Sequence, residues 1–594
     1  MDGTNYWQSR LSRRSAMRAG VLAGVGGLGL AVVGCSSSTN NTSNSSATKA
    51  AAGAPSTAGT SAAARPSGTA AAAAATQAVT PKPGGTISFW SVGDTTLDPF
   101  KAATFRAQIL SGYYYGRLLK LKSGPKLSDY YQYDSEPDVA QSVESPDLTT
   151  WTFKLRPNVL FHDIPPVSGR AIDADDVVAT YKRFISTAEN VNKNNLTMID
   201  TVTAPDKQTV VFKLKFPYAP FKNIVATPSY FWLMPKEADN GYDPTKTPIG
   251  TGPWILDSYT PAVGWKFKRN PKYWQTGKPY IDTANFSIIP DAANQLAQFL
   301  SGNLDIHDVP PSDVATIKKQ KPDATIDANV SATYGFIWGQ LRDKNSAWND
   351  ERLRQAVSYA VDRKTLLDIA YVGEGKFLTS FPASFGKWYL DPQGKDFGEN
   401  AKFYKYDPKA AKQLLDASGQ ANTTFKFIYT NNAYGDTFNQ YVDATRGMLA
   451  DAGFKLQVVT LDYNKEYIDN KVGIFYNGNL VDNTSLVYSL ETGFSEVDEH
   501  LFNELHPTGP RNHNGVNDPA LVDFIDKQRN AASDADRKKV LDDVQRYTAG
   551  KMYHVPTMIG NRYIAWQKWV KGATPAAGYD FATAFFANAW IDKS

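Results

Sequence analysis

Few side chains in the sequence stand at spacings that support known chemistry. Its single cysteine, Cys35, excludes internal disulfides, CxxC redox centres and cysteine-based zinc sites. The sequence contains no G-x-S-x-G elbow, no HExxH pair and no phosphate-binding G-x-x-x-x-G-K-[ST] loop. We therefore expect no enzyme and no cofactor. A secreted hydrolase stays as an alternative, because paired carboxylates for glycoside hydrolysis leave no local motif.

Histidines and clustered acids give two candidate metal sites. His500, His506 and His513 are spaced six and seven residues apart, which is not a recognised coordination spacing, so we interpret them as scattered surface histidines in a loop. Asp173 opens a predicted helix, and the acids that follow it are favoured by the helix dipole without any ion. We expect no metal at either place.

The N-terminal segment has the layout of an export signal. A polar start leads to Arg13 and Arg14, and an apolar run over residues 19–34 ends at Cys35. The arginine pair resembles a twin-arginine signal, and the residues that end at the cysteine resemble a bacterial lipobox. Residues 1–35 are thus predicted to be a signal peptide whose cysteine receives the lipid that anchors the protein to the membrane.

Residues 36–83 consist mainly of Ser, Thr, Asn and Ala, too polar and too simple to bury a core. We expect a disordered tether there. The formal charge of +4 is misleading, because the first 83 residues carry a net excess of positive charge and the remainder is slightly acidic. A near-neutral body without a Lys/Arg run argues against nucleic acid as a partner.

The rest of the chain mixes two periodicities. Residues 150–156 and 210–215 alternate apolar and polar side chains, which predicts half-buried strands. Residues 350–370 carry apolar side chains at helical spacing, and Ser533 with Asp536 begins a late helix. Because 594 residues exceed what one hydrophobic core accommodates, an α/β protein of more than one domain is expected.

Several short motifs along this body resemble the family 5 extracellular solute-binding proteins, which include dipeptide-, oligopeptide- and nickel-binding lipoproteins. The strongest stretch is AQSVESPDLTTWTFKLRPNVLFHD at residues 140–163. The supporting motifs follow in the family's order: TLDP at 96–99, PYAPF at 217–221, GTGP at 250–253, RNPKYW at 269–274 and RQAVSYAVDR at 354–363.

The resemblance implies a two-lobed clamshell like that of periplasmic binding proteins, of class II and cluster C type, with an extra inserted domain. The ligand would lie between the lobes and favour their closure, because it binds the closed state better than the open one. The closed form would then dock on the membrane subunits of an ABC importer. We place lobe I at 84–116, 245–328 and 560–594, the insert at 117–244, and lobe II at 329–559.

The family's peptide-binding members use a WxxD segment in lobe II, whose aspartate pairs with the ligand's amino terminus. The corresponding stretch here begins at Tyr476, with Asn479 in place of that aspartate and Asp482 nearby. An amide lacks the charge-assisted bond to an ammonium group, which favours a neutral ligand such as an oligosaccharide over a free-amine peptide.

Four aromatic residues complete the predicted ligand site: Tyr113, Tyr114, Trp90 and Trp388. Core packing is the competing interpretation for each of them. The ligand itself stays open between a peptide and an oligosaccharide, with a nickel-chelate carrier and a receptor lipoprotein as alternatives. We expect a monomer in which no residue is catalytic.

Overall fold

The computed structural model describes residues 80–101, 105–122, 134–573 and 586–594, except for residues 191, 229, 332, 433, 468–473, 475–480, 493, 495 and 532. The chain divides into two units, Met1–Gln77 and Ala78–Ser594, and the fold described below is that of the second unit. The expected signal peptide, with Arg13, Arg14 and Cys35, and almost all of the expected tether lie outside the described residues. Among the described helices, none is long and apolar enough to span a membrane.

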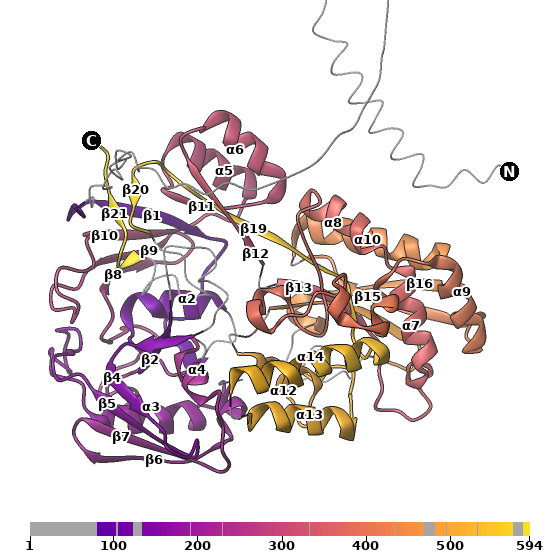
Figure 1. Cartoon of the computed structure of the whole chain (residues 1–594). Coiled ribbons are helices and arrows are strands. Elements are labelled where there is room, and N and C mark those ends of the chain that lie inside the picture. The colour runs from indigo at the N-terminus through magenta and orange to yellow at the C-terminus, as the bar shows by residue number, and fades with distance from the viewer. Residues whose placement is uncertain are drawn as a thin grey trace, which may run out of the picture. The chain divides into compact units, whose positions relative to one another are not determined.

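The first sheet has the strand order β1-β10-β9-β8 (Figure 1). β1 and β10 run parallel, and the other neighbours are antiparallel. Its strands are β1 (Thr86–Ser91), β8 (Trp254–Thr260), β9 (Gly264–Arg269) and β10 (Thr283–Ile288). Helix α2 (Phe105–Tyr114) supplies Tyr113, whose ring stacks on Phe267 of β9 with centroids 4.6 Å apart. This aromatic contact fixes the helix to the sheet.

The second sheet is antiparallel, with the order β4-β5-β7-β6. It comprises β4 (Ala140–Glu144), β5 (Thr150–Leu155), β6 (Ile199–Asp206) and β7 (Thr209–Leu214). The alternating segments 150–156 and 210–215 are confirmed as strands, and they pair with Trp151 opposite Phe212. Helix α3 (Ala174–Ser186) contacts β6 and β7 and begins at Asp173 with a capping box. Asp176 binds the Arg170 guanidinium with both carboxylate oxygens.

The third sheet has the order β16-β15-β17-β13-β18. Its strands are β13 (Thr333–Trp338), β15 (Thr424–Thr430), β16 (Lys455–Leu461), β17 (Ser485–Thr492) and β18 (Val555–Pro556). Its helices are α7 (Glu351–Ala360), α8 (Arg363–Tyr371), α9 (Pro408–Ala417), α10 (Gly435–Asp451), α12 (Val497–Leu505), α13 (Pro519–Arg529) and α14 (Asp534–Lys551). Helices α12, α13 and α14 lie side by side (Figure 1).

The single helix predicted over residues 350–370 is wrong. Val361 has extended backbone angles, and the Asp362 side chain accepts a hydrogen bond from the Thr365 amide, so a new helix begins there. The buried Arg363 side chain holds this turn in place by donating hydrogen bonds to the backbone oxygens of Ser358 and Pro556. The apolar residues keep helical spacing across this break, because both helices bury apolar side chains. The spacing alone therefore does not show where the first helix ends.

A fourth sheet, β11-β19-β12, is continuous in sequence with the third. β19 (Met558–Trp566) follows β18 after one residue, and β12 (Thr325–Val330) is followed by β13 after two. β11 (Ile306–Val309) and β14 (Gly375–Phe377) also pair with β19. At the connection, Thr557 donates from its hydroxyl to the Gly335 carbonyl at 2.6 Å. Two adjacent strand connections therefore link the third and fourth sheets.

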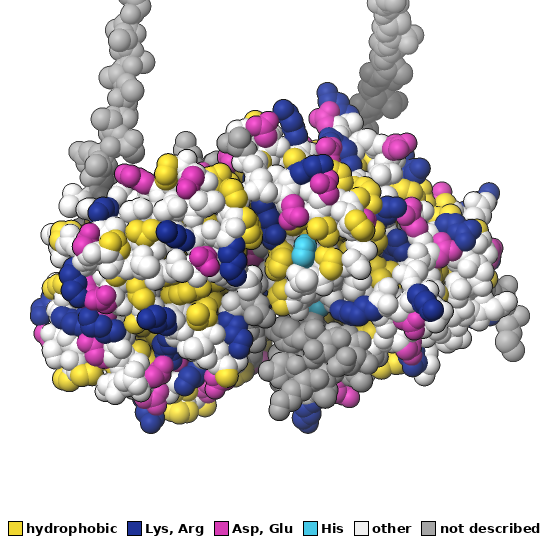
Figure 2. All heavy atoms as spheres, turned by 90° about the horizontal axis from the view of Figure 1, so that it is seen from below, with side chains coloured by type: hydrophobic (Ala, Val, Ile, Leu, Met, Phe, Trp, Pro, Cys, Tyr) yellow, Lys and Arg dark blue, Asp and Glu magenta, His cyan; other side chains and the backbone are white. Residues whose placement is uncertain are grey.

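Short elements complete the described fold. The remaining helices are α4 (Phe221–Ala226), α5 (Ala292–Ser301) and α6 (Val314–Gln320), and the remaining strands are β2 (Leu119–Leu121), β3 (Ser135–Pro137), β20 (Val570–Lys571) and β21 (Trp590–Ile591). Single turns lie at Pro99–Lys101, Lys193–Leu196, Pro311–Asp313, Ala347–Asn349, Ala383–Trp388, Lys395–Phe397, Glu399–Tyr404 and Tyr463–Tyr467. On the face drawn in Figure 2, basic and acidic side chains are interspersed.

The glycines of the GTGP segment, residues 250–253, let its backbone pass close to the backbone at the end of α2. A β-carbon on Gly250 would collide with the carbonyl oxygen of Tyr114, at the end of α2. We expect Gly250→Ala to lower the free energy of unfolding by about 1–3 kcal/mol, as overpacking of a rigid core does. Gly93→Ala is the matched control, because its β-carbon meets only the flexible end of Arg106. Equal urea midpoints for the two variants would contradict this packing.

Candidate functional site

A buried polar centre lies where β17, α12 and the loop after α12 meet. Glu491 stands near the end of β17, opposite Tyr334 of β13. Helix α12 begins where the Glu496 side chain accepts a hydrogen bond from the Asp498 amide, and it carries Glu504 in its last turn. Residues 506–515 then return along the helix to bring Arg511 and His513 to β17.

The loop approaches α12 closely at Gly509, where a β-carbon would collide with backbone oxygens of Phe502 and Asn503. Arg342 holds the far end of the loop by donating to the carbonyl oxygens of Asn512 and His513, at 2.5 and 2.8 Å. The position of His513 is therefore fixed by backbone contacts on both sides.

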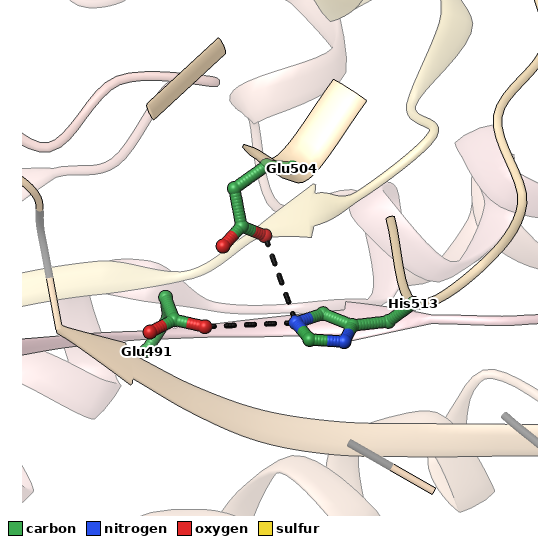
Figure 3. A group of neighbouring side chains, drawn as sticks. All are labelled: Glu491, Glu504 and His513. Atoms are coloured by element: carbon green, nitrogen blue, oxygen red, sulfur yellow. Dashed lines mark ion pairs between the residues drawn. The ribbon is translucent and has the colours of Figure 1, made fainter. Parts of the chain in front are cut away.

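Two carboxylates face one imidazole in this centre (Figure 3). His513 Nε2 lies 3.5 Å from Glu491 Oε2 and 3.8 Å from Glu504 Oε2. Arg511 Nη1 donates to Glu491 Oε1 at 2.6 Å, and its guanidinium lies over the Phe494 ring. The three side chains of Glu491, Glu504 and His513 are no more than 2% exposed. Glu491 is therefore paired with a fixed guanidinium, and both acids face the same imidazole.

Burial dominates the proton affinities of this region. Removal from water, and next the negative charge of Glu491, raise the pKa of Glu504 well above its usual range. Burial raises the pKa of Glu499 to about 8 and lowers the pKa of His500 to about 4. Burial therefore favours the uncharged forms of Glu499, Glu504 and His500.

The acidic first turn of α12 meets the segment that connects β7 to β8. Tyr218, from the PYAPF motif, donates to Asp498, and Tyr230 donates to Glu499. Asn223 Nδ2 donates to Glu496 Oε2 at 3.2 Å. Each carboxylate that borders α12 at this end thus has a neutral donor from the predicted insert.

Arginines of the neighbouring helices complete this pairing. Arg529 Nε donates to Asp498 Oδ1 at 2.7 Å, and Arg537 donates to Glu496. A pocket of about 110 Å³ remains beside these contacts. Its lining includes Asn195, Phe216, Tyr218, Glu499, Asn503 and Arg529. The pocket is small and lined by both polar and apolar side chains, with room for a few water-sized groups.

The residues predicted for the ligand's amino terminus are only partly described. Tyr476 and Asn479 lie outside the described residues. Asp482 begins the turn before β17, where it pairs with Lys426 and accepts hydrogen bonds from Thr484 and Ser485. Partial burial opposes its ionisation, but Lys426 and these donors hold the pKa of Asp482 at about 2. Its role toward a ligand stays a prediction.

The four predicted aromatic residues differ in their surroundings. Tyr113 and Tyr114 are almost fully buried, and the Tyr114 hydroxyl donates to the Leu97 carbonyl. Trp388 is buried beneath the Arg537 guanidinium. Trp90 is half-buried, and its Nε1 donates to His307 Nδ1 at 3.2 Å. The recorded contacts of the two tyrosines are those of core residues.

The interpretation of the three histidines as surface residues is wrong for two of them. His500 lies inside α12 at 3% exposed, and His513 is 1% exposed. Only His506 is half-buried, where its Nδ1 contacts the Thr508 hydroxyl. Spacing could not reveal the polar centre, because its members come from a strand, a helix and a loop that meet only in the folded chain.

Residues 134–499 match the family model of the bacterial extracellular solute-binding proteins, family 5. The chain belongs to this family, whose members are the extracytoplasmic solute-binding proteins of ABC importers. A curated relative, the glutathione-binding protein GsiB of Escherichia coli K12, is 26% identical over 395 residues, which cover 65% of this chain and 72% of GsiB.

Solved structures show the same fold. The substrate-binding protein CtaP of Listeria monocytogenes has a TM-score of 0.71 at 22% identity, covering 86% of this chain and all of CtaP. DppA of Helicobacter pylori, solved in complex with the peptide STSA, has a TM-score of 0.71 at 20% identity, covering 86% of this chain and 99% of DppA. The expected α/β fold of periplasmic binding proteins is therefore confirmed.

The proton on Glu499 gives a testable pH dependence. A carboxyl pKa raised from 4.5 to about 8 means that the folded state binds the proton more tightly than the unfolded state. Its contribution to stability is complete below about pH 4.5 and is lost as the pH rises toward 8. Glu499→Gln keeps an acceptor for Tyr230 and removes the charge. We expect this variant to unfold like the wild type at pH 4.5 and to be more stable at pH 8, by on the order of 3 kcal/mol.

Urea titrations at the two pH values measure this difference. Glu144→Gln is the control, because Glu144 is exposed on β4 and its replacement should leave the pH dependence unchanged. Parallel pH profiles for the wild type and Glu499→Gln would show that Glu499 ionises normally.

Proposed function

We propose that this protein is an exported, lipid-anchored receptor that captures a small peptide or oligosaccharide and delivers it to an ABC importer. The family match over residues 134–499 supports the transport role. The geometry that best supports a closing mechanism is the pair of short strand connections, β12 to β13 and β18 to β19, between the third and fourth sheets. Two adjacent connections allow a hinge rotation about one axis and restrain other motions.

The insert at 117–244 and the lobe II segment at 329–559 provide the surfaces that meet on closure. Tyr218, Asn223 and Tyr230 belong to the first, and the acidic turn of α12 belongs to the second. A bound ligand supplies the remaining free energy, because it contacts both lobes only when they are closed. We propose that the protein acts as a monomer, without catalysis, and that ATP is hydrolysed on other chains.

Two arguments bear on the ligand. The similar proteins GsiB and DppA are named or solved as binders of glutathione and of a peptide, which favours a peptide. Asn479, in place of an aspartate that would pair with an amine, favours a neutral compound such as an oligosaccharide.

A thermal-shift screen separates these ligand classes. The full chain with Cys35→Ala is melted with glutathione, the free-amine peptide Ser-Thr-Ser-Ala, or neutral oligosaccharides. A true ligand at 100 times its dissociation constant stabilises the protein by about 2.7 kcal/mol. We expect Asn479→Asp to strengthen the shift with free-amine peptides, while Asn479→Ala does not.

Each outcome of this screen is informative. If only free-amine peptides raise the melting temperature, and Asn479→Asp does not change that rise, the role assigned to Asn479 is refuted. Chemical turnover of any compound in the panel would refute the transport receptor and indicate the hydrolase.

Export and anchoring are tested in cells. We expect Cys35→Ala to move the mature protein from the membrane to the soluble extracytoplasmic fraction, because the acyl chains are lost. We expect replacement of both Arg13 and Arg14 by Lys to stop export by the twin-arginine route. Fractionation followed by mass spectrometry of the N-terminal peptide measures both effects. Normal export of the double-lysine variant would indicate the general secretory route.

A further inference from the structure

Three potential metal ligands converge in the polar centre from different parts of the chain. Glu491, Glu504 and His513 each present one ligand atom, and these atoms lie within 4.8 Å of one another. Figure 3 shows one ring nitrogen of His513 facing both carboxylates. A strand, a helix and a loop thus direct two oxygens and one nitrogen toward a common point.

The spacing of these atoms suits ligands of a shared ion better than direct hydrogen bonds. The Nε2–oxygen distances of 3.5 and 3.8 Å are long for a hydrogen bond. Ligands of a tetrahedral ion, each about 2.0–2.2 Å from the metal, lie roughly 3.3 Å apart. A contraction of a few tenths of an ångström would therefore bring each carboxylate oxygen to the distance from Nε2 that a shared ion requires.

Glu504 gives an independent indication of a missing partner. Among the described residues no N–H or O–H group donates to its carboxylate oxygens, although its side chain is only 1% exposed, and the group within hydrogen-bond reach is a second acid, Glu491. A buried carboxylate without a donor carries a large desolvation cost. A cation between Glu504 and His513 would remove that cost.

The surroundings hold the other ligands in place. Arg511 binds Oε1 of Glu491, so that Oε2 is the oxygen turned toward His513. Such outer contacts orient metal-binding carboxylates. Arg342 fixes the backbone of the loop at His513. When both carboxylates are ionised, as metal binding requires, they carry one more negative charge than Arg511 compensates.

We propose that Glu491, Glu504 and His513 bind one divalent transition-metal ion that joins β17, α12 and the loop of residues 506–515. Two carboxylates and an imidazole are ligands typical of Zn²⁺, Co²⁺ or Ni²⁺ rather than of Mg²⁺ or Ca²⁺. The ion is a structural cross-link and not the transported solute, because all three side chains are enclosed by protein. The proposal does not depend on the identity of that solute.

The experiment uses the full chain with Cys35→Ala, which removes the only thiol. After dialysis against a chelator, calorimetry with ZnCl₂, NiCl₂ or MgCl₂ measures stoichiometry, and melting curves measure stabilisation. We expect one equivalent of Zn²⁺ or Ni²⁺ to bind and raise the melting temperature, with no effect of Mg²⁺. Binding should weaken as the pH is lowered from 7.5, because protons compete with the metal for carboxylate and imidazole ligands.

Variants locate the ion. Glu504→Gln and His513→Gln should each abolish the metal-dependent shift, whereas His506→Gln, in the same loop, should retain it. Glu504→Gln keeps the shape of the side chain and introduces no charge, so it should fold without metal. It therefore keeps the test valid if His513→Gln fails to fold.

Three results would overturn the proposal. The first is that neither Zn²⁺ nor Ni²⁺ binds at pH 7.5. A shared proton, rather than a metal ion, would then be the partner of Glu504. The second is an unchanged metal shift in Glu504→Gln, which places the ion elsewhere. The third concerns His513→Gln. If this variant loses the rise in melting temperature caused by an organic ligand but keeps the rise caused by the metal, the polar centre is a solute subsite.

Discussion

The cost of burying carboxylates governs the region around α12. Glu496, Asp498, Glu499 and Glu504 are all removed from water on or beside one helix. Buried charge is tolerated only when it is paired or neutralised by a proton. The structure uses both solutions: arginines of α13 and α14 pair with two of these acids, and burial raises the pKa of the other two.

This constraint links packing to function. Side chains of the predicted insert donate to the first three of these acids, whereas α12 packs with the helices of the third sheet. Separating these surfaces would exchange hydrogen bonds between side chains for hydrogen bonds to water, and each such exchange changes the free energy by only about 0.5–1.5 kcal/mol. A solute receptor needs such a balance, because a ligand can shift an equilibrium only by its differential affinity.

The polar centre of Glu491, Glu504 and His513 borders the same helix, which contributes Glu504, but it has a different character. Its ligand atoms are positioned by backbone contacts and by arginines rather than by the insert. All three residues come from the segment predicted as lobe II, which suits a structural role. The pocket beside Tyr218 and Arg529, in contrast, is formed by residues from both the insert and the α12–α13 region.

The sequence by itself determined the family, the half-buried strands β5 and β7, and the capped starts of α3 and α14, because alternation, capping and short motifs are local properties. Only the tertiary structure decided that Tyr113 and Tyr114 are buried, that the predicted helix at 350–370 breaks at Val361, and that His500 and His513 are enclosed. Glu491 and His513 are 22 residues apart in the chain and meet through sheet pairing and loop packing. Burial depends on contacts between distant segments, and local spacing carries no information about those contacts.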